Sequence, residues 1–491
     1  MTSSIYSTNT LTSSLIRGIN QTQNQLDRSF ERLSTGLRVN SNRDDPSSIP
    51  NISRAASQIS SLSAASKNAS AAMAQLTAAD SALSEVSEMI LRIKDLAIQA
   101  SSAAITTTDR TAFVDEAALL TSEIESISTR VKSNGRTLLD GSYGGIVAHV
   151  GTQAFETISM SISSASPSSI GTYLSTGPTR DALTAAQSAT ANTTTSSEDI
   201  VLTANQASTT IDVAANDSAK TVAAKVNAIS DSTLVSAEAV TFASLFSTNA
   251  SSANYTVSIN GTSTSAFAIS SSNVTDAVSK INLISATTGV TASATAANKV
   301  LLQDATGDDI TIENAGAGSD LDVQAIQSDG STTQGSAVSL GVGASSNNDA
   351  TRVIGTLRLF SHASFSVSQS GNTSLGYATT ETPSLSSLAS IDLSSAVAAG
   401  NSLSTVDGAI EQLSMNRGRI GATQSRLGFA DSLLSTQTLN ASSRLGELQD
   451  ADYAMESAAL AKTMVLQQIN TALLAQANAS SELVMKLIES D

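Results

Sequence analysis

One short segment concentrates side chains that could do chemistry: DATGDDITIE holds Asp304, Asp308, Asp309 and Glu313. Carboxylate oxygens are the ligands that hard cations such as Ca²⁺ prefer. The spacing is not that of an EF-hand loop, and solvated turns on an acidic surface explain the cluster better. The sequence therefore predicts no metal site.

The side chains that catalysis needs are scarce. The two histidines, His149 and His362, lie on unrelated strand-like segments, and there is no cysteine, so neither an HExxH zinc motif nor a thiolate site can form. No glycine-rich phosphate loop follows a predicted strand, and the many serines lack the sequence context of a Ser–His–Asp triad. We therefore expect no enzymatic activity and no bound cofactor.

The composition also limits the possible partners. The 491 residues carry a net charge of −17, and residues 141–400 hold 7 basic and 19 acidic side chains, so most of the acidity lies in the middle of the chain. A nucleic-acid-binding protein needs a basic face. We therefore expect no nucleic-acid partner.

No segment predicts insertion into a membrane. Spanning a bilayer takes about twenty apolar residues in a row, and the sequence has no such run. The first residues, MTSSIYSTNTLTSSLIRGIN, lack the basic start and continuous apolar core of a cleaved signal peptide. If the protein leaves the cell, we expect a route that requires no removable signal.

The apolar residues near the start of the chain are spaced as in helices. Steps of three and four, or their sum, connect Leu15, Ile19, Leu26, Phe30, Leu33 and Leu37. A break at 40–50 contains Pro46 and Pro50, and the helical spacing then resumes from Ile59. A further helix is predicted from Phe113 to Val131, with Ser133-Asn134-Gly135 as its C-terminal cap.

The other end of the chain repeats a seven-residue pattern. Apolar residues occupy Val406, Leu413, Ile420, Leu427, Leu434, Ala441 and Leu448. The companion seam through Arg417, Gln424 and Asp431 is half polar, as in a helix that shares its face with another helix or subunit. One long amphipathic core helix would explain the same pattern, but not why both long helices lie at chain ends.

The last predicted helix has an unusual polar face. Within the uncharged residues 463–481, VLQQINTALLAQAN (465–478) places Leu466, Ile469, Leu473 and Ala477 on one apolar stripe. The other face carries amides and a hydroxyl where a solvated helix usually carries Lys and Glu: Gln467, Gln468, Asn470, Thr471 and Gln476.

The middle of the chain is rich in predicted strands. About a third of residues 141–400 are Ser or Thr, and runs such as YTVSIN (255–260) and VIGTLRLF (353–360) alternate as strands do. VAAKVNAIS (222–230) and AVSKINLIS (277–285) align at an offset of 55 residues. We interpret them as parts of two tandem β-α-β modules, at about 196–250 and 252–315.

Both ends of the chain resemble bacterial flagellin. At the N-terminal end the resemblance rests on ERLSTGLRVNSNRDD (31–45), ILRIKDLAIQA (90–100), SNGRTLLDGSYGG (133–145) and VGTQAFETISMSI (150–162). At the C-terminal end it rests on LASIDLSS (388–395), LSTVDGAIEQL (403–413), IGATQSRL (420–427) and DADYAMESAALAKTMVLQQINTALLAQAN (450–478). It covers roughly residues 1–175 and 385–491. The two modules resemble, more weakly, the β-rich insert of many flagellins.

The resemblance implies a multidomain α + β fold. The N- and C-terminal helices would pair as coiled-coil or bundle domains, with a β-rich (α+β) outer region inserted between them. It implies an inner-tube helix in 1–48, outer-tube helices and a β-hairpin in 49–175, a variable surface-exposed region in 176–390, an outer-tube helix in 391–448 and an inner-tube helix in 449–491.

The resemblance also implies a function. The protein would be an extracellular structural subunit that self-assembles into the bacterial flagellar filament for swimming motility. Its terminal segments would fold on assembly, when neighbouring copies cover their apolar faces. Its partners would be copies in a helical homopolymer, the type III flagellar export apparatus, a flagellin chaperone, the filament cap and the hook–filament junction proteins. A hook–filament junction protein of the same family is the alternative.

Two sets of residues would make the packing contacts. Inner-helix and subunit packing is expected from Leu15, Ile19, Leu26, Phe30, Leu33, Leu37, Leu466, Ile469, Leu473 and Ala477, and outer-helix packing from Leu413, Ile420, Leu427, Leu434 and Leu448. We expect the apolar stripe of 465–478 to meet the N-terminal helix at 15–37 and neighbouring subunits. Its Gln and Asn face would line a wet tube interior.

Some flagellins are recognised by the innate flagellin receptor of animals, Toll-like receptor five. Arg92, Leu96 and Gln99 in LRIKDLAIQ resemble the recognised motif and share one helix face, and Glu123 resembles its acidic partner. The same face could instead pack against the next subunit. The Ser and Thr residues of the middle region suit O-linked glycosylation, or merely solubilise an exposed β domain.

The chain departs from the family pattern at two places. It has DDPSSIP where the family usually has DDAAGL, and Ser133 stands where a Phe is common before Asn-Gly. Because Pro46 and Pro50 cannot lie deep in a helix, we expect the second helix to start near Pro50.

Overall fold

The computed structural model describes residues 10–102, 104–196, 198–204, 207–316, 321–341, 348–369 and 380–489. Contacts divide the chain into two units. Unit 1 contains 1–74, 146–160 and 423–491, and unit 2 contains 75–145 and 161–422. The predicted fold class is confirmed, because the N- and C-terminal regions are helical and the central region is rich in strands. None of the described helices combines the length and the hydropathy that a membrane span requires.

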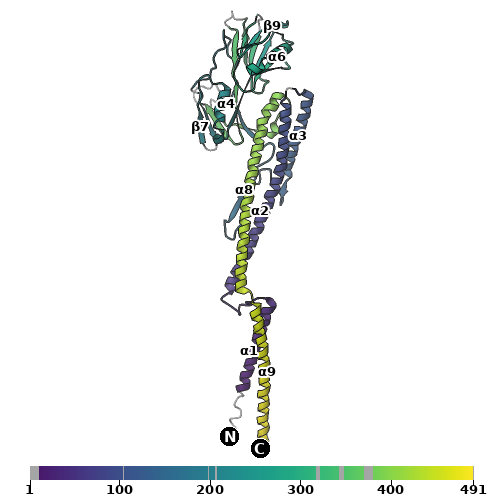
Figure 1. The fold of residues 1–491 in the computed structure, drawn as a ribbon, viewed down its shortest axis with the longest axis vertical. Helices are drawn as coiled ribbons and strands as arrows, with labels where there is room; N and C mark the ends of the chain where they lie inside the picture. Colours follow the sequence, from purple (N-terminus) through teal and green to yellow (C-terminus); the bar gives the residue numbers. More distant parts are fainter. Residues whose placement is uncertain are drawn as a thin grey trace. The chain divides into compact units, whose positions relative to one another are not determined.

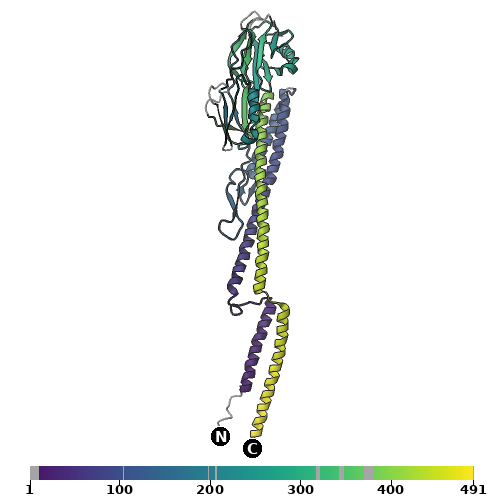
Figure 2. The same cartoon turned by 60° about the vertical axis from the view of Figure 1, so that its left-hand side comes forward.

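Long helices at the two chain ends run side by side. Figures 1 and 2 both show α1 beside α9 and α2 beside α8. Their bounds are α1 Thr10–Thr35, α2 Ile49–Ala100, α8 Ala396–Gln449 and α9 Tyr453–Glu489. Helices α2 and α8 each contribute one part to each unit.

The stripe of α8 that repeats every seven residues is its packing face. In unit 2, Val406, Leu413 and Ile420 are buried, and in unit 1 Leu427, Leu434 and Ala441 are buried while Leu448 is half-buried. In unit 1 the partners of this face are Leu62 and Ala65 of α2. The companion seam is half-buried at Arg417, Gln424 and Asp431. Asp431 accepts a hydrogen bond from Ser66 at 2.6 Å, which explains how a polar residue fits there.

The α1–α2 connector and the α8–α9 junction are hydrogen-bonded to each other within unit 1. The α1–α2 connector starts at Gly36, whose φ of +74° favours glycine. Backbone hydrogen bonds join Arg38 N to Gln449 O at 2.6 Å and Ala451 N to Gly36 O at 2.9 Å. The Arg38 guanidinium also donates to Leu448 O at 2.6 Å. The two breaks, far apart in sequence, therefore form one joint.

Two aspartates order the rest of the connector. Asp44 accepts hydrogen bonds from the Ser41 amide and hydroxyl, and Asp45 accepts them from Ser47 and Ser48. Helix α2 then begins at Ile49, so Pro50 lies in its first turn, where a missing N–H costs nothing. The DDPSSIP sequence thus forms a helix start.

In unit 2, α3 spans Thr107–Arg130. Its N-cap is Thr106, whose side-chain oxygen accepts a hydrogen bond from the Asp109 N–H. The predicted cap at Ser133-Asn134-Gly135 is wrong, because the helix ends at Arg130. Asn134 and Gly135, both at positive φ, instead form the turn between strands β1 (Lys132–Ser133) and β2 (Arg136–Thr137). An Asn-Gly pair suits a two-residue hairpin turn as well as a helix end.

A buried arginine closes the α2–α3 loop. Arg110 donates from Nε to Ala100 O at 3.0 Å, and from Nη2 to the carbonyls of Ser102 and Ile105. It thereby satisfies backbone groups that the end of α2 leaves without helical partners.

The central strands of unit 2 form one large sheet and several smaller ones. The main path of the large sheet has the order β13 (Val290–Ala294), β14 (Val300–Asp304), β8 (Ser236–Ser247), β19 (Thr356–Ser361), β5 (Gly171–Thr176) and β21 (Ser384–Ser387). Two further strands branch from β8: β16 (Leu321–Ile326) pairs with β8, and β17 (Thr333–Leu340) pairs with β16. A four-stranded sheet has the order β11 (Thr262–Ser263), β10 (Val257–Ile259), β15 (Ile310–Asn314) and β18 (Ala350–Val353). A three-stranded sheet has the order β20 (Phe365–Gln369), β6 (Ile200–Ala204) and β7 (Ala207–Ile211), and β12 (Phe267–Ile269) pairs with β9 (Ala253–Tyr255).

The 55-residue repeat is visible in the hydrogen bonds. Helices α4 (Ala219–Asn227) and α5 (Ser230–Thr233) correspond to α6 (Thr275–Asn282) and α7 (Ser285–Thr288). The side chain of Asn227 bonds both backbone groups of Ala237, and Asn282 does the same to Ala292. Each helix is thereby fastened to the strand that follows it, by the same residue of the repeat.

The central region is joined to the helices of unit 2 at a narrow neck. Strands β5 and β21 pair Gly171 with Ser387, so the chain enters and leaves the central region side by side. A Cβ at Gly171 would lie 2.0 Å from Ser386 O, and one at Gly408 of α8 would lie 2.7 Å from Gly171 O. Only glycine allows these backbones to approach so closely.

Replacing Arg110 with methionine should destabilise the soluble protein by about 2–4 kcal/mol, because three carbonyls lose a charged donor. Urea unfolding followed by circular dichroism measures this change. Arg54→Met, at an exposed position of α2, is the control and should change stability by less than about 0.5 kcal/mol. Equal stability of the Arg110 variant and wild type would contradict the role given to this side chain.

The connector should loosen in acid. Hydrogen bonds from the Ser47 and Ser48 side chains lower the pKa of Asp45 to about 2. A lowered folded pKa means that the contribution is complete above the unfolded value of about 4 and is lost as the pH falls through about 2. Hydrogen exchange of residues 44–52, corrected for intrinsic rates, should therefore slow between pH 2 and 4 and then stay constant.

In the Asp45→Ala variant this pH dependence should shrink to the part that Asp44 contributes, because hydrogen bonds from Ser41 lower the pKa of Asp44 as well, whereas the exposed Asp95→Asn control should keep it in full. Protection that stays unchanged in Asp45→Ala would show that the carboxylate does not order the connector.

Candidate assembly surface

Helices α1 and α9 meet through polar side chains. Thr22, Ser29 and Thr463 are buried at their contact. Gln467 Nε2 donates to Gln23 Oε1 at 2.7 Å, and Asn470 Nδ2 donates to Thr22 Oγ1 at 3.2 Å. We call this contact the polar seam. The polar seam supplies hydrogen-bond partners for the side-chain amides of Gln467 and Asn470, which lie within the uncharged residues 463–481.

An acidic residue of α9 completes the seam near the connector. Glu456 accepts the Ser29 hydroxyl at 2.7 Å and lies 3.7 Å from the Arg32 guanidinium. Gly18 brings the two helices close at the other end, since a Cβ there would already touch the Asn470 amide at 3.8 Å. Small and polar residues therefore define the approach of the two helices.

The apolar stripe of α9 flanks the polar seam. Leu466, Ile469 and Leu473 are 38%, 48% and 48% exposed, whereas Ala477 is buried. The expectation that this stripe packs on the N-terminal helix and on neighbouring subunits stays a prediction. On the polar face, the side chains of Gln467 and Asn470 find hydrogen-bond partners on α1.

The apolar residues predicted on the N-terminal helix divide between two environments. Leu15, Ile19, Leu26, Leu33 and Leu37 are half-buried, while Phe30 is exposed. The seam on α1 thus alternates half-buried apolar residues with the buried Thr22 and Ser29.

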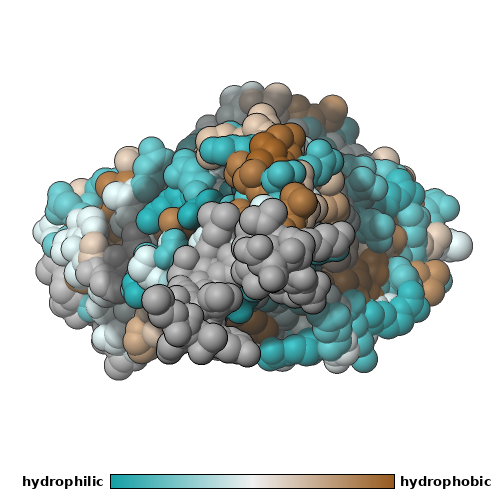
Figure 3. Space-filling view, turned by 90° about the horizontal axis from the view of Figure 1, so that it is seen from below, coloured by the Kyte–Doolittle hydropathy of each residue, from teal (hydrophilic) through white to brown (hydrophobic). Residues whose placement is uncertain are grey.

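Bare apolar surface is concentrated in unit 1. Fifteen of the twenty-one large apolar side chains that are exposed among the described residues belong to it, although unit 2 is the longer. On α8 and α9 they include Phe429, Leu433, Leu439, Tyr453, Met455, Met464 and Val465 beside the stripe. Figure 3 shows apolar side chains reaching the surface on one face of the molecule. An extended apolar surface of this kind marks a binding interface.

The residues that resemble the receptor motif are only partly accessible. Arg92 and Gln99 are exposed, but Leu96 is 1% exposed and packs with Ala117 of α3. Arg92 Nε forms a 2.7 Å ion pair with Glu116, one helical repeat before the exposed Glu123. This pair raises the pKa of Arg92.

The carboxylate cluster of the central region serves the fold. Asp304 accepts hydrogen bonds from Thr306, and Asp308 lies 3.3 Å from Lys220. Asp309 accepts from Arg352 and Asn192 at 2.9 Å, and its burial raises its pKa. Glu313 lies in β15. Within the described ranges, no group of three acidic or histidine side chains is arranged to hold a metal ion.

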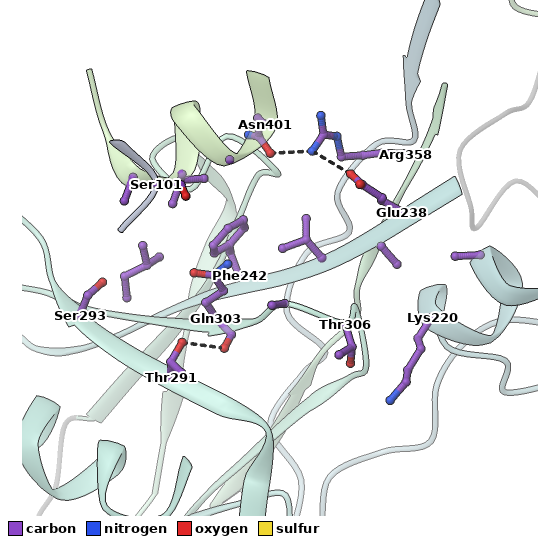
Figure 4. A pocket seen from close by; sticks show the side chains of 18 of the residues that line it. Ser101, Lys220, Glu238, Phe242, Thr291, Ser293, Gln303, Thr306, Arg358 and Asn401 are labelled. Atoms are coloured by element: carbon purple, nitrogen blue, oxygen red, sulfur yellow. Dashed lines mark hydrogen bonds and ion pairs between the residues drawn. The ribbon is translucent and has the colours of Figure 1, made fainter. Parts of the chain in front are cut away.

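A cavity of about 930 Å³ lies beside the central sheet. Figure 4 shows Arg358 pointing toward Asn401 and Glu238, with Phe242 and Gln303 below them. Arg358 donates to Asn401 at 2.6 Å, and burial lowers its pKa. Two more lining residues, Asn227 and Asn282, are engaged by the backbone of the repeat. The polar groups here fasten the sheet to α8.

Comparison with known proteins identifies the helical ends. Residues 6–144 match the model for the bacterial flagellin N-terminal helical region, and residues 403–488 match that for the bacterial flagellin C-terminal helical region. The B-type flagellin of Pseudomonas aeruginosa is 31% identical over 96% of this chain and 97% of its own length. The chain belongs to the bacterial flagellin family. This family is structural, and its members polymerise into the flagellar filament.

Other relatives match over shorter stretches. A flagellin of Clostridium tyrobutyricum is 33% identical over 28% of this chain and 37% of its own length. Among solved structures, FliC from Burkholderia pseudomallei is 17% identical, covering 72% of this chain and 99% of that one with a TM-score of 0.30. Flagellar hook associated protein-3 from Legionella pneumophila is 12% identical, covering 81% and 98% with a TM-score of 0.35. Superpositions this loose do not distinguish a filament subunit from a junction protein.

Proposed function

We propose that this flagellin is the repeating subunit of an extracellular flagellar filament. The observation that carries the proposal is the exposed stripe of Leu466, Ile469 and Leu473 on a helix whose polar face is already satisfied by α1. Burying a side chain of this size completely is worth about 1.5–3 kcal/mol. A single chain leaves 38–48% of each of these side chains exposed and so forgoes that share of the free energy, and neighbouring copies would supply the cover.

The arrangement of this surface favours a polymer over a closed dimer. Exposed apolar residues occur along α1, α8 and α9, so several faces of one copy need partners at once. Contacts between different faces of identical copies are heterologous, and they generate a helical polymer when the rotation does not close. The same reasoning explains why the terminal helices would fold firmly only on assembly.

A hook–filament junction protein is the alternative within the family. It would use the same helical ends but stop after one ring of subunits. Electron microscopy of purified protein added to short filament seeds distinguishes the two functions, since a filament subunit grows long tubes.

The remaining partners follow from the proposed function. A filament subunit would leave the cell through the flagellar type III export apparatus, guarded by a chaperone that covers its helical ends. It would then add beneath the filament cap, beyond the junction proteins.

Replacing Ile469 and Leu473 together with glutamine should weaken assembly. Each side chain is 48% exposed in the single chain, so each substitution removes roughly 0.7–1.4 kcal/mol of apolar burial per added subunit, and the critical concentration should rise about tenfold or more. Seeded polymerisation measured by light scattering and electron microscopy tests this. Gln468→Ala, an exposed polar position on the same helix, is the matched control and should polymerise like wild type. Normal tubes from the double variant would refute the proposed contact.

We also propose that the free monomer is recognised by the animal flagellin receptor through Arg92, Gln99 and Glu123. The exposure of these three side chains supports the proposal, and Leu96 would act by holding the helix in place. Purified monomer should activate receptor-expressing reporter cells, and Arg92→Ala should reduce the response while Arg54→Ala does not. An inert wild-type monomer would rule this recognition out.

A further inference from the structure

One aromatic side chain of unit 1, that of Phe155, is almost fully exposed to solvent, and the backbone of the same residue is strained. Phe155 lies in the loop between β3 (Ile146–His149) and β4 (Thr157–Met160) and is 95% exposed. Its φ is +73°, a conformation that favours glycine. Its carbonyl accepts the Thr157 N–H at 2.8 Å, so it is the first residue of a γ-turn centred on Glu156.

The loop itself is tightly held, so the ring is presented by a fixed support. Val150 N donates to Glu156 O at 2.9 Å, and the Glu156 carboxylate accepts the Gln153 N–H at 2.9 Å. Glu156 folds over Gly151, where a Cβ would lie 1.9 Å from its Oε2. The Asn68 amide of α2 donates to His149 O at 3.2 Å, which fixes the base of the hairpin.

Neither feature of Phe155 helps the single chain. A non-glycine residue at positive φ is strained, and an exposed ring buries no surface. Observed strain of this kind points to a function outside the folding of the chain itself.

Unit 2 carries an apolar groove of about 610 Å³. One wall is a single face of α3, formed by Val114, Ala117, Ala118 and Thr121. The other wall is formed by Pro167, Leu388, Ala389, Ile391 and Leu393.

The groove is preformed, because backbone bonds hold one wall together and a side-chain bond ties that wall to α3. Leu388 N donates to Ile170 O at 2.9 Å, and Ala389 N donates to Pro167 O at 3.1 Å. The Ser166 hydroxyl donates to Glu125 of α3 at 2.6 Å. Glu125 is the one charged side chain among the described residues that line the groove, and this bond already engages it.

We propose that Phe155 of one copy inserts into the α3 groove of a second copy. This inference rests on the proposed function and names one of its subunit contacts. An aromatic ring presents roughly 150–250 Å² for burial, and the groove offers an apolar lining of sufficient volume. The loop brings one charged side chain, Glu156, which is hydrogen-bonded within the loop, so no unpaired charge would be buried.

The two surfaces are different and lie on the same chain, so the contact is heterologous. Every copy carries both the ring and the groove, and each occupied groove leaves a further ring free to bind the next copy. The contact therefore extends a helical polymer when the rotation between successive copies does not close a ring.

The first test separates assembly from folding. Phe155→Gly removes the ring and relieves the strain, because glycine accepts positive φ. Its monomer should melt at the same temperature as wild type or slightly higher, while its critical concentration for seeded polymerisation should rise about tenfold or more, as for other buried aromatic anchors. Leu283→Ala, which removes a 75% exposed apolar side chain from the central region, should change neither value. Polymerisation of Phe155→Gly at the wild-type critical concentration would overturn the proposal.

The second test locates the contact in the filament. The chain has no cysteine, so introduced thiols report a single pair of positions. Mixed filaments of Ala154→Cys and Ala118→Cys copies should form disulfide-linked dimers on mild oxidation, since a disulfide requires Cα atoms within about 7 Å. Ala154→Cys mixed with Leu283→Cys should not.

The possible failures are distinguishable. Filaments that form normally but give no link between positions 154 and 118 would overturn this contact alone. Wild-type protein that never elongates a seed would overturn the filament function and this contact with it.

Discussion

The polar seam between the first and last helices determines what the rest of unit 1 must do. Gln467 and Asn470 find their hydrogen-bond partners on α1, and a helix can turn only one face toward a given neighbour. Leu466, Ile469 and Leu473 lie beside this face and stay 38–48% exposed. An ordinary amphipathic pair buries its apolar faces against each other, whereas this pair mixes half-buried apolar residues with polar ones at its contact.

The mixed contact makes the stability of the helix pair depend on neighbours. Each hydrogen bond of the seam contributes about 0.5–1.5 kcal/mol net, and the exposed 38–48% of Leu466, Ile469 and Leu473 forgoes roughly 0.6–1.4 kcal/mol more for each side chain. The seam fixes the register and direction of α1 and α9. Because hydrogen bonds need exact partners and apolar burial does not, the specific contacts lie inside the chain and further apolar burial is left for other copies. Assembly and folding of the ends then become one process.

Periodicity predicted the faces of the long helices but not the partner of each face. The stripe from Val406 to Leu448 could be read from the sequence because one side of α8 is buried along its whole length. For 465–478 the same spacing identified the two faces, but hydropathy did not indicate that Gln467 and Asn470 bond to α1 while much of the apolar stripe stays exposed. Asn134-Gly135 fits a helix cap or a hairpin turn, and only the pairing of Lys132 with Thr137 decides. Arg110 left no sequence signal, because an isolated cation on a helix usually remains solvated.

The neck at β5 and β21 explains how a long β-rich region can interrupt a helical protein. The chain leaves the helices of unit 2 at Gly171 and returns at Ser387, which pairs with Gly171. The residues between them are therefore an insertion between two neighbouring backbone positions. The two larger cores of the central region are formed by residues between 173 and 367, while a smaller cluster of Phe242, Leu301 and Ile326 packs against Val397 of α8. Residues within the two larger cores can therefore change in sequence and length without altering the helical packing, provided that Gly171 and Gly408 keep the two backbones close. The constraint on assembly thus falls on the chain ends, where the exposed apolar surface is concentrated.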